Sequence, residues 1–144
     1  MSAPKTLLAR HRQIPPAASV RVSPLCLGAM TFGQAGAAIQ GSTTEAESTA
    51  ILDSFYQAGG NFIDTANGYQ SGKSEERLGR WMVERGNRDE IVIATKFTTP
   101  YMAAHQDKIQ SNFSGNGSKS IQLSLEASLN KMQTTYVDVL YLHW

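Results

Sequence analysis

Short apolar segments alternate with amphipathic ones along most of the chain, and this alternation limits the folds that the sequence can adopt. Strand-like runs lie at residues 25–27, 62–64, 91–96 and 137–143, separated by segments with the helical spacing of apolar residues. The runs are almost continuously apolar, as is typical of strands buried on both faces of a sheet. The order strand, helix, strand, helix, strand, helix, strand predicts parallel strands joined by crossover helices.

The helical segments have recognisable ends and faces. Ser42 with Glu45, or Thr44 with Glu47 in a competing register, forms a capping box for the first helix. Ser74 is predicted to cap the second helix. In the third helix apolar residues follow one another at spacings of four, four and three, which predicts a buried face. The side chains predicted for the core are Leu52, Phe55, Tyr56, Leu78, Trp81, Met82, Ile121, Leu125, Leu129 and Met132.

The length and proline distribution indicate one domain with a lead-in. A chain of 144 residues fits a single domain of ordinary size. Residues 1–19 contain three of the five prolines, and we expect a flexible lead-in there. Residues 20–144 form the predicted domain, beginning with a strand-like alternation at residues 20–22. Because 41% of the residues are hydrophobic and only 17% are charged, this part can bury a core.

Charge and cysteine content argue against several classes of protein. The net charge of +1 gives no reason to expect a nucleic-acid or membrane-surface partner. The one cysteine, Cys26, can form neither an internal disulfide nor a zinc cluster, and its apolar surroundings predict a buried thiol. No metal site is therefore expected. No segment approaches the ~20 apolar residues of a membrane helix, and the first residues lack the apolar core of a signal peptide. We expect a cytoplasmic protein.

Polar side chains close several of the apolar strands. Asp64, Lys96 and His143 stand at the ends of three predicted strands, and Tyr69 lies five residues beyond Asp64. In a parallel α/β sheet or barrel the carboxyl ends of the strands meet at one rim, where such folds place their active sites. The sequence therefore predicts that a carboxylate, a phenol, an ammonium and an imidazole share one small space.

These four groups suit the reduction of a carbonyl. Hydride addition leaves negative charge on the carbonyl oxygen, which must then receive a proton. A phenol is a weak acid at neutral pH, and a nearby ammonium such as Lys96 favours its ionised form. Asp64 would hold that ammonium in place, Tyr69 would supply the proton, and His143 could orient the carbonyl by a hydrogen bond.

The local sequences around these residues resemble the aldo-keto reductase family. The matching segments are FIDTANGY at 62–69, GKSEERLG at 72–79, IATK at 93–96, YVDVLYLH at 136–143 and LGAMTFG at 27–33. The resemblance extends over residues 20–144 and is nearest to the fungal aryl-alcohol dehydrogenase branch. As an ordered set over four strands it is highly specific.

The resemblance implies a (β/α)8 barrel that binds NADP(H) without a Rossmann fold, and no G-x-G-x-x-G motif is present. It implies Tyr69 as proton donor, Lys96 as the group that favours the phenolate, Asp64 as the partner of Lys96 beside the nicotinamide ribose, and His143 as the residue that orients and binds the substrate. The substrate would be a small aldehyde or ketone, or an aryl alcohol in the reverse direction, in a role such as fungal secondary metabolism. The residues implied near the nicotinamide are Gly28, Ala29, Met30 and Thr31.

A phosphate-binding loop is the competing functional interpretation of residues 68–74. This segment lies between a strand and a helix and ends in Gly72-Lys73-Ser74. Three residues separate its glycines, whereas a P-loop has four, so its amides could not surround a phosphate in the same way. The sequence therefore favours carbonyl reduction over nucleotide hydrolysis.

The length allows only part of the implied barrel. A complete (β/α)8 barrel takes about 250 residues, so the resemblance implies an N-terminal half of about four parallel strands and three crossover helices that this chain does not close. We expect a truncated form with little activity alone. Its unpaired strand edges favour a homodimer or a partner chain. The alternative function is a non-catalytic half barrel that acts through such association.

Overall fold

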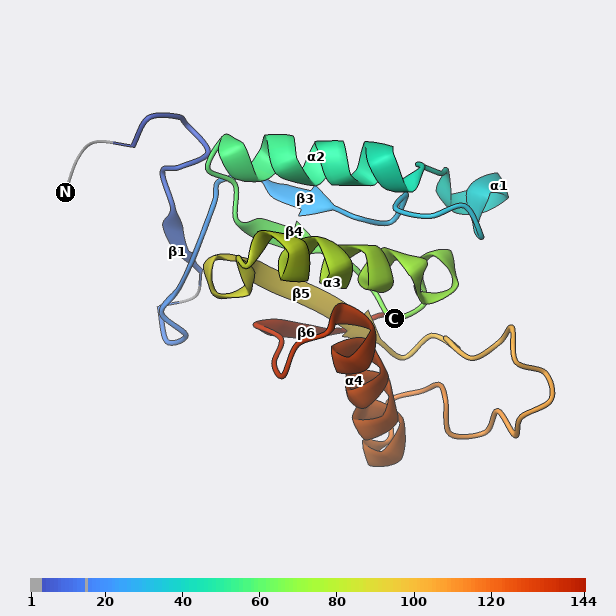
Figure 1. Ribbon diagram of the computed structural model, residues 1–144. Coiled ribbons are helices and arrows are strands. Elements are labelled where there is room, and N and C mark those ends of the chain that lie inside the picture. Colours follow the sequence, from blue (N-terminus) through green and yellow to red (C-terminus); the bar gives the residue numbers. More distant parts are fainter. Residues whose placement is uncertain (1–3, 15) are drawn as a thin grey trace.

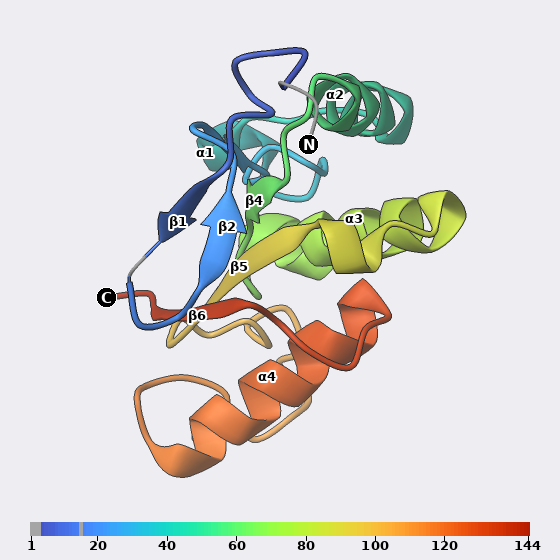
Figure 2. The same cartoon turned by 90° about the vertical axis from the view of Figure 1, so that its left-hand side faces the viewer.

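The molecule is built on a four-stranded parallel sheet, shown by a computed structural model that describes residues 4–14 and 16–144. The strands stand in the order β3-β4-β5-β6 (Figure 1). Their bounds are Cys26–Gly28, Phe62–Asp64, Val92–Phe97 and Val139–Leu142. Three long helices, α2 (Glu45–Gln57), α3 (Lys73–Arg85) and α4 (Ser118–Met132), connect them and lie on the same side of the sheet (Figure 2). The predicted alternation of strands and helices is confirmed.

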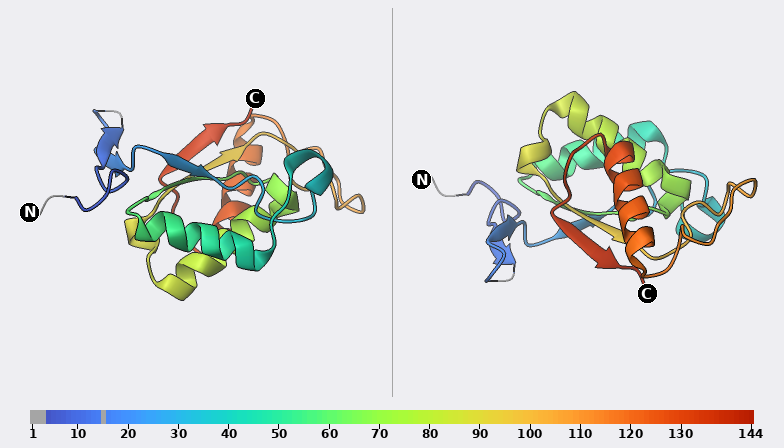
Figure 3. Two further views of the ribbon diagram at one scale, coloured as in Figure 1. Left: turned by 90° about the horizontal axis from the view of Figure 1, so that it is seen from above. Right: turned by 90° about the horizontal axis from the view of Figure 1, so that it is seen from below.

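The register of the sheet brings the carboxyl ends of the strands together. Gly28 pairs with Asp64, Asp64 pairs with Ala94, and Lys96 pairs with Tyr141. All strands run in one direction, so the residues that follow them emerge at one edge. This edge lies beside the C-terminus in both views of Figure 3.

A short hairpin precedes the sheet. Strand β1 (Arg12–Ile14) pairs in antiparallel fashion with β2 (Val20–Val22), and the two form a separate sheet (Figure 2). The segment predicted as a flexible lead-in thus contains a strand, β1, which its proline content did not lead us to expect. Residues 1–3 and 15 of that lead-in lie outside the described residues. The mobility of the segment stays a prediction.

The main core lies between the sheet and α2 and α3. Ile63 and Ile93 from the central strands are fully buried against Leu52, Leu78 and Trp81 from the helices. The Trp81 ring meets the Tyr56 ring edge-on, with centroids 5.9 Å apart. Most of the side chains predicted for the first two helical faces therefore contribute to the core, with Phe55 and Tyr56 at its partly buried margin.

The helix caps only partly follow the sequence prediction. Thr44 is the N-cap of α2, and its hydroxyl and backbone form the capping box with Glu47, so the competing register is the one that forms. Ser74 does not cap α3, because the helix begins at Lys73 and its N-cap is Gly72. Its hydroxyl instead donates to the Ala29 carbonyl oxygen at 2.7 Å and ties α3 to the end of β3.

The buried face of α4 differs from the predicted one. Ser120, Ser124 and Ser128 are buried together with Met132. The predicted face residues Ile121, Leu125 and Leu129 are only half-buried. Helix α4 comes close to α3 near its end, where a Cβ on Gly79 of α3 would lie 2.6 Å from the Met132 backbone. The buried side of α4 thus consists of three serines and Met132, whereas hydrophobic periodicity alone predicts large apolar residues there.

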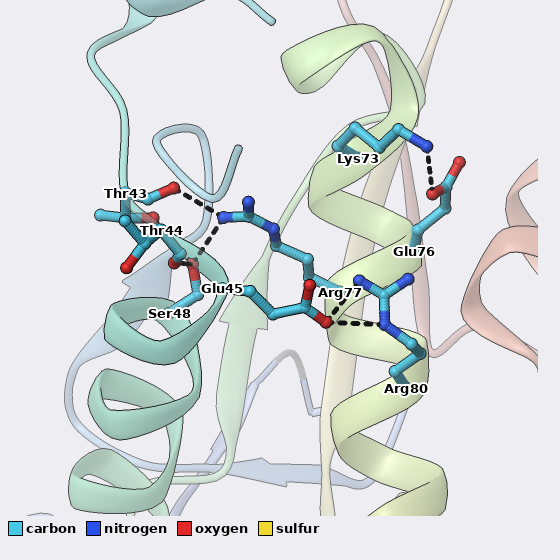
Figure 4. A network of polar contacts seen from close by, with 8 residues as sticks. All are labelled: Thr43, Thr44, Glu45, Ser48, Lys73, Glu76, Arg77 and Arg80. Carbon is cyan, nitrogen blue, oxygen red and sulfur yellow. Dashed lines mark hydrogen bonds and ion pairs between the residues drawn. The ribbon is translucent and has the colours of Figure 1, made fainter. Parts of the chain in front are cut away.

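Polar contacts join the beginning of α2 to α3 (Figure 4). Arg77 donates to the Thr43 carbonyl oxygen at 2.7 Å and to the Ser48 hydroxyl at 3.0 Å. Arg80 forms an exposed ion pair with Glu45 at 2.7 Å. These bonds fix the end of the loop that enters α2, which matters for the site described below.

Cys26 is exposed, so the predicted buried thiol is wrong. It lies on β3, the first strand of the sheet, and β3 has only one neighbouring strand, β4. Partial burial, together with the nearby Asp64 carboxylate, raises the pKa of the thiol from 9.0 to about 11. Among the described residues, no helix is long and apolar enough to cross a membrane.

Candidate active site

The four polar residues predicted to meet at the rim lie together. The Lys96 ammonium donates to Asp64 Oδ2 at 2.5 Å, to the Thr65 carbonyl oxygen at 2.8 Å and to the Tyr69 hydroxyl at 3.3 Å. All three donors of the ammonium are therefore used. The side chains of Asp64 and Lys96 are 28% and 15% exposed, so this pair lies largely out of water, unlike an ordinary surface ion pair.

His143 completes the group from the end of β6. Its ring meets the Tyr69 ring edge-on, with centroids 5.6 Å apart, and its backbone N–H donates to the Phe97 carbonyl oxygen at 3.0 Å. Burial, followed by the positive charge of Lys96, lowers the pKa of the imidazole below 6.5. A neutral imidazole has one donor and one acceptor nitrogen, so His143 can donate a hydrogen bond at neutral pH without adding a second positive charge.

A cleft of about 550 Å³ opens over Tyr69 and His143. Met30, Ile39, Pro100 and Trp144 give its lining an apolar part, and Tyr69 and His143 are among its polar groups. Such a combination is typical of sites for small organic molecules. The other lining residues are Gln40, Gly68 and Thr99.

The segment predicted beside the nicotinamide is only partly at the cleft. Met30 lines it, and Gly28 lies beside Asp64 with open space where a Cβ would stand. Ala29 is buried in the core and Thr31 is not among the lining residues. The arrangement fits a flat ring against Met30 and Gly28. None of the described lining residues is a lysine or arginine, so they would not neutralise the phosphates of a dinucleotide.

The turn that carries Tyr69 has an unusual backbone. Gln70 and Ser71 have φ of 52° and 55°, and Gly72 follows with φ of 89°. A left-handed conformation costs a residue with a side chain roughly 1–2 kcal/mol. The Gln70 amide donates to Gln40 Oε1 and the Ser71 amide to the Gly68 carbonyl oxygen. These amides are used within the protein, so the phosphate-loop interpretation gains no support.

Three site features escaped the sequence prediction. Trp144 stacks on the His143 ring, with centroids 5.7 Å apart and planes 8° from parallel. Ile39 lines the cleft from the short helix α1 (Ala37–Gln40), for which the sequence analysis predicted no helix. Gln70 is fully buried beside Tyr69. Adjacency to the predicted residues was the only signal for Trp144 and Gln70.

A tyrosine, lysine, aspartate and histidine thus lie together at the carboxyl rim of parallel β/α units, the edge at which such folds place their active sites. The Aldo/keto reductase family matches residues 24–144, and this chain belongs to that family. Members of this family generally use NAD(P)H.

Relatives come from fungi and their names are those of oxidoreductases. The chain is 56% identical to norsolorinic acid reductase B of Aspergillus parasiticus over 144 residues, which is 100% of this chain and 38% of that protein. It is 53% identical to an aryl-alcohol dehydrogenase of Pestalotiopsis microspora, over 97% of this chain and 36% of that protein. The chain thus spans less than two-fifths of the length of either.

A solved structure supports the same fold. An aldo-keto reductase from Bacillus halodurans, in its holo form, superimposes with a TM-score of 0.70 at 25% identity. The match covers 92% of this chain and 39% of that one. The predicted fold, part of an aldo-keto reductase barrel with four parallel strands, is confirmed.

Proposed function

We propose that the chain carries the catalytic residues of an NADPH-dependent reductase that converts an aldehyde or ketone into an alcohol, or runs the reverse oxidation of an aryl alcohol. The observation that supports this most is the contact of Lys96 with both Asp64 and Tyr69, the latter of which lines the cleft. NADPH rather than NADH is proposed on the ground of the family resemblance.

The bound cofactor would supply a hydride to the carbonyl carbon. As the C=O π electrons move onto oxygen, Tyr69 would donate its hydroxyl proton to that oxygen. Lys96, held by Asp64, would stabilise the phenolate that is left, because opposite charges at this distance in a partly dry site attract strongly. His143 would hold the carbonyl oxygen through a hydrogen bond from a neutral ring. Ala29 and Thr31 have no proposed part in cofactor binding.

The lining of the cleft favours an aromatic carbonyl compound. Met30, Ile39 and Trp144 give it apolar walls on which a flat ring can pack. The relatives' names, norsolorinic acid reductase and aryl-alcohol dehydrogenase, agree with a bulky or aromatic substrate in fungal secondary metabolism.

An NADPH titration followed by tryptophan fluorescence tests cofactor binding, and NADPH consumption with benzaldehyde at 340 nm tests the chemistry. Tyr69→Phe should abolish turnover and leave NADPH binding unchanged. Tyr141→Phe, on the exposed part of β6, is the matched control and should retain both. Equal turnover in the wild type and Tyr69→Phe would refute the role of Tyr69.

We further propose that the 144-residue chain alone turns over slowly, because the described residues that line its cleft include no lysine or arginine to bind the cofactor phosphates. A robust turnover number from the purified monomer would overturn this.

A second function, a non-catalytic half barrel that acts by association, is favoured by the exposed residues at the end of the sheet. Leu142 and Trp144 are 62% and 91% exposed beside the unpaired edge of β6. A homodimer or a partner chain that pairs with this edge would cover them. Sedimentation equilibrium of the wild type and Leu142→Lys tests this: a dimer lost in the variant supports association, and a monomer at all concentrations refutes the homodimer.

A further inference from the structure

Gln70, the residue after Tyr69, is a fully buried amide whose side chain binds one loop. Its Oε1 accepts a hydrogen bond from the Gly36 N–H at 2.8 Å. Its Nε2 donates to the carbonyl oxygens of Met30 at 3.0 Å and Gly41 at 2.9 Å. All three bonds go to the loop between β3 and α2, residues 29–44. Buried amides with all groups satisfied specify one arrangement of their surroundings.

The loop also contacts the backbone and the Cβ of Gln70. The Gln70 N–H donates to Gln40 Oε1 at 2.9 Å. At Gly33 a Cβ would lie 2.4 Å from the Gln70 Cβ, so the loop backbone packs directly on this side chain. The far end of the loop is fixed separately, by the bond from Arg77 to Thr43 (Figure 4).

Ala29 and Phe32 anchor the beginning of this loop in the core, whereas its outer part, residues 34–41, forms one wall of the cleft and has no buried residue. Met30, Ile39 and Gln40 line the cleft, and helix α1 contains no buried residue. Ile39 is 93% exposed. Burial in the core therefore does not hold residues 34–41, and hydrogen bonds from Gln70 reach this outer part at Gly36, Gln40 and Gly41.

We propose that Gln70 is a positioning residue that fixes residues 34–41 of the loop as the wall of the cleft and couples that wall to the neighbouring Tyr69 phenol. The left-handed turn at Gln70 directs its side chain into the loop while Tyr69 stays at Lys96. Substrate size would then be set through this residue, although it does not line the cleft. Only that last consequence rests on the proposed carbonyl-reducing function.

Hydrogen exchange measured residue by residue by NMR tests the proposal on the 144-residue chain without any ligand. In Gln70→Met the loop amides, above all that of Gly36, should exchange at least about tenfold faster, because the lost bonds leave local opening unopposed. The amides of β5 should be unchanged. Gln57→Met, the same replacement at an exposed site on α2, is the matched control. Unchanged exchange at Gly36 would overturn the proposal.

Two further variants separate positioning from a general loss of structure. Gln70→Glu keeps the acceptor for Gly36 but loses both donors, so Gly36 should stay protected while the amides near residue 41 exchange faster. Gly33→Ala removes no hydrogen-bonding group and should displace Gln70 through the clash. It remains informative if Gln70→Met fails to fold. A Gly33→Ala protein with wild-type exchange throughout the loop would count against the proposal.

Benzaldehyde binding, followed by quenching of tryptophan fluorescence, tests the consequence for the cleft. Gln70→Met should weaken binding several-fold, and Gln57→Met should not. If loop exchange responds to Gln70 as expected but the wild type binds no benzaldehyde, the positioning role stands and the proposed substrate class fails. If benzaldehyde binds equally to wild type and Gln70→Met, the coupling of the wall to Gln70 is refuted.

Discussion

Removal of the Lys131 charge should be among the most damaging single changes in the molecule. Lys131 on α4 forms an ion pair with Glu75 on α3 at 2.8 Å, and the Glu75 side chain is 0% exposed. The other Glu75 oxygen accepts a hydrogen bond from the Thr95 hydroxyl at 2.6 Å. Lys131 also donates to the Asn67 carbonyl oxygen at 2.9 Å. The pair thus joins two helices to the strand and the loop that carry Lys96 and Tyr69.

Lys131→Met keeps most of the side-chain volume and leaves a buried carboxylate without its partner. Breaking a buried pair in this way costs about 3–5 kcal/mol. That is a large part of the roughly 5–15 kcal/mol by which domains are stable. With a urea dependence near 2 kcal/mol per molar, the unfolding midpoint should fall by roughly 1.5–2.5 M.

Urea unfolding at pH 7, followed by fluorescence, measures this directly. The double variant Glu75→Gln/Lys131→Met should recover at least about 1 kcal/mol relative to Lys131→Met, because no charge then stays buried. Lys119→Met, on the exposed first turn of the same helix, should change the free energy of unfolding by less than about 0.5 kcal/mol. A loss below about 1 kcal/mol in Lys131→Met, with an additive double variant, would refute the reasoning.

Three other changes have defined outcomes. Gly79→Ala should lower the free energy of unfolding by about 1–3 kcal/mol in thermal unfolding, because its Cβ would meet the Lys131 and Met132 backbone at 2.6 Å. Gly117→Ala, whose Cβ would have nothing within 4 Å, is the control and should be close to neutral. Because the pKa of His143 is lowered, its neutral ring contributes stability above pH 6.5 that is lost as the pH falls. His143→Gln should therefore flatten the dependence of the free energy of unfolding on pH between pH 5 and 7. An unchanged slope of that dependence would contradict this. At pH 8 the thiol of Cys26, with its pKa near 11, should react with iodoacetamide about 100-fold more slowly than in the urea-unfolded chain, and equal rates would exclude the raised pKa.

The sequence predicted the site better than the packing around it. Asp64, Lys96 and His143 could be placed at one rim because parallel strands present their carboxyl ends together, and this depends only on the order of elements. The left-handed turn at Gln70 could not be predicted, because glutamine has no preference for that conformation and is held there by bonds to a distant loop.

The spacing of apolar residues in the sequence also could not predict which faces of the elements pack closely against each other. The spacing of Leu125 and Leu129 indicated a buried face, but three of the four residues of α4 that the contacts with its neighbours bury are serines. The exposure of Cys26 had a similar cause: burial depends on the neighbours of a strand as well as on its own apolar residues. Such features follow from three-dimensional contacts that no local pattern encodes.

The sheet order β3-β4-β5-β6 is also the order in which the strands leave the ribosome. From β4 onward, each strand is made after the strand with which it pairs, so the sheet can grow from β3 one strand at a time without displacing an earlier strand. At roughly 5–20 residues per second, the span from Asp64 to His143 is synthesised within about 4–16 seconds. The aspartate, tyrosine and lysine precede the histidine by at least 47 residues, so these three can meet before β6 joins the sheet.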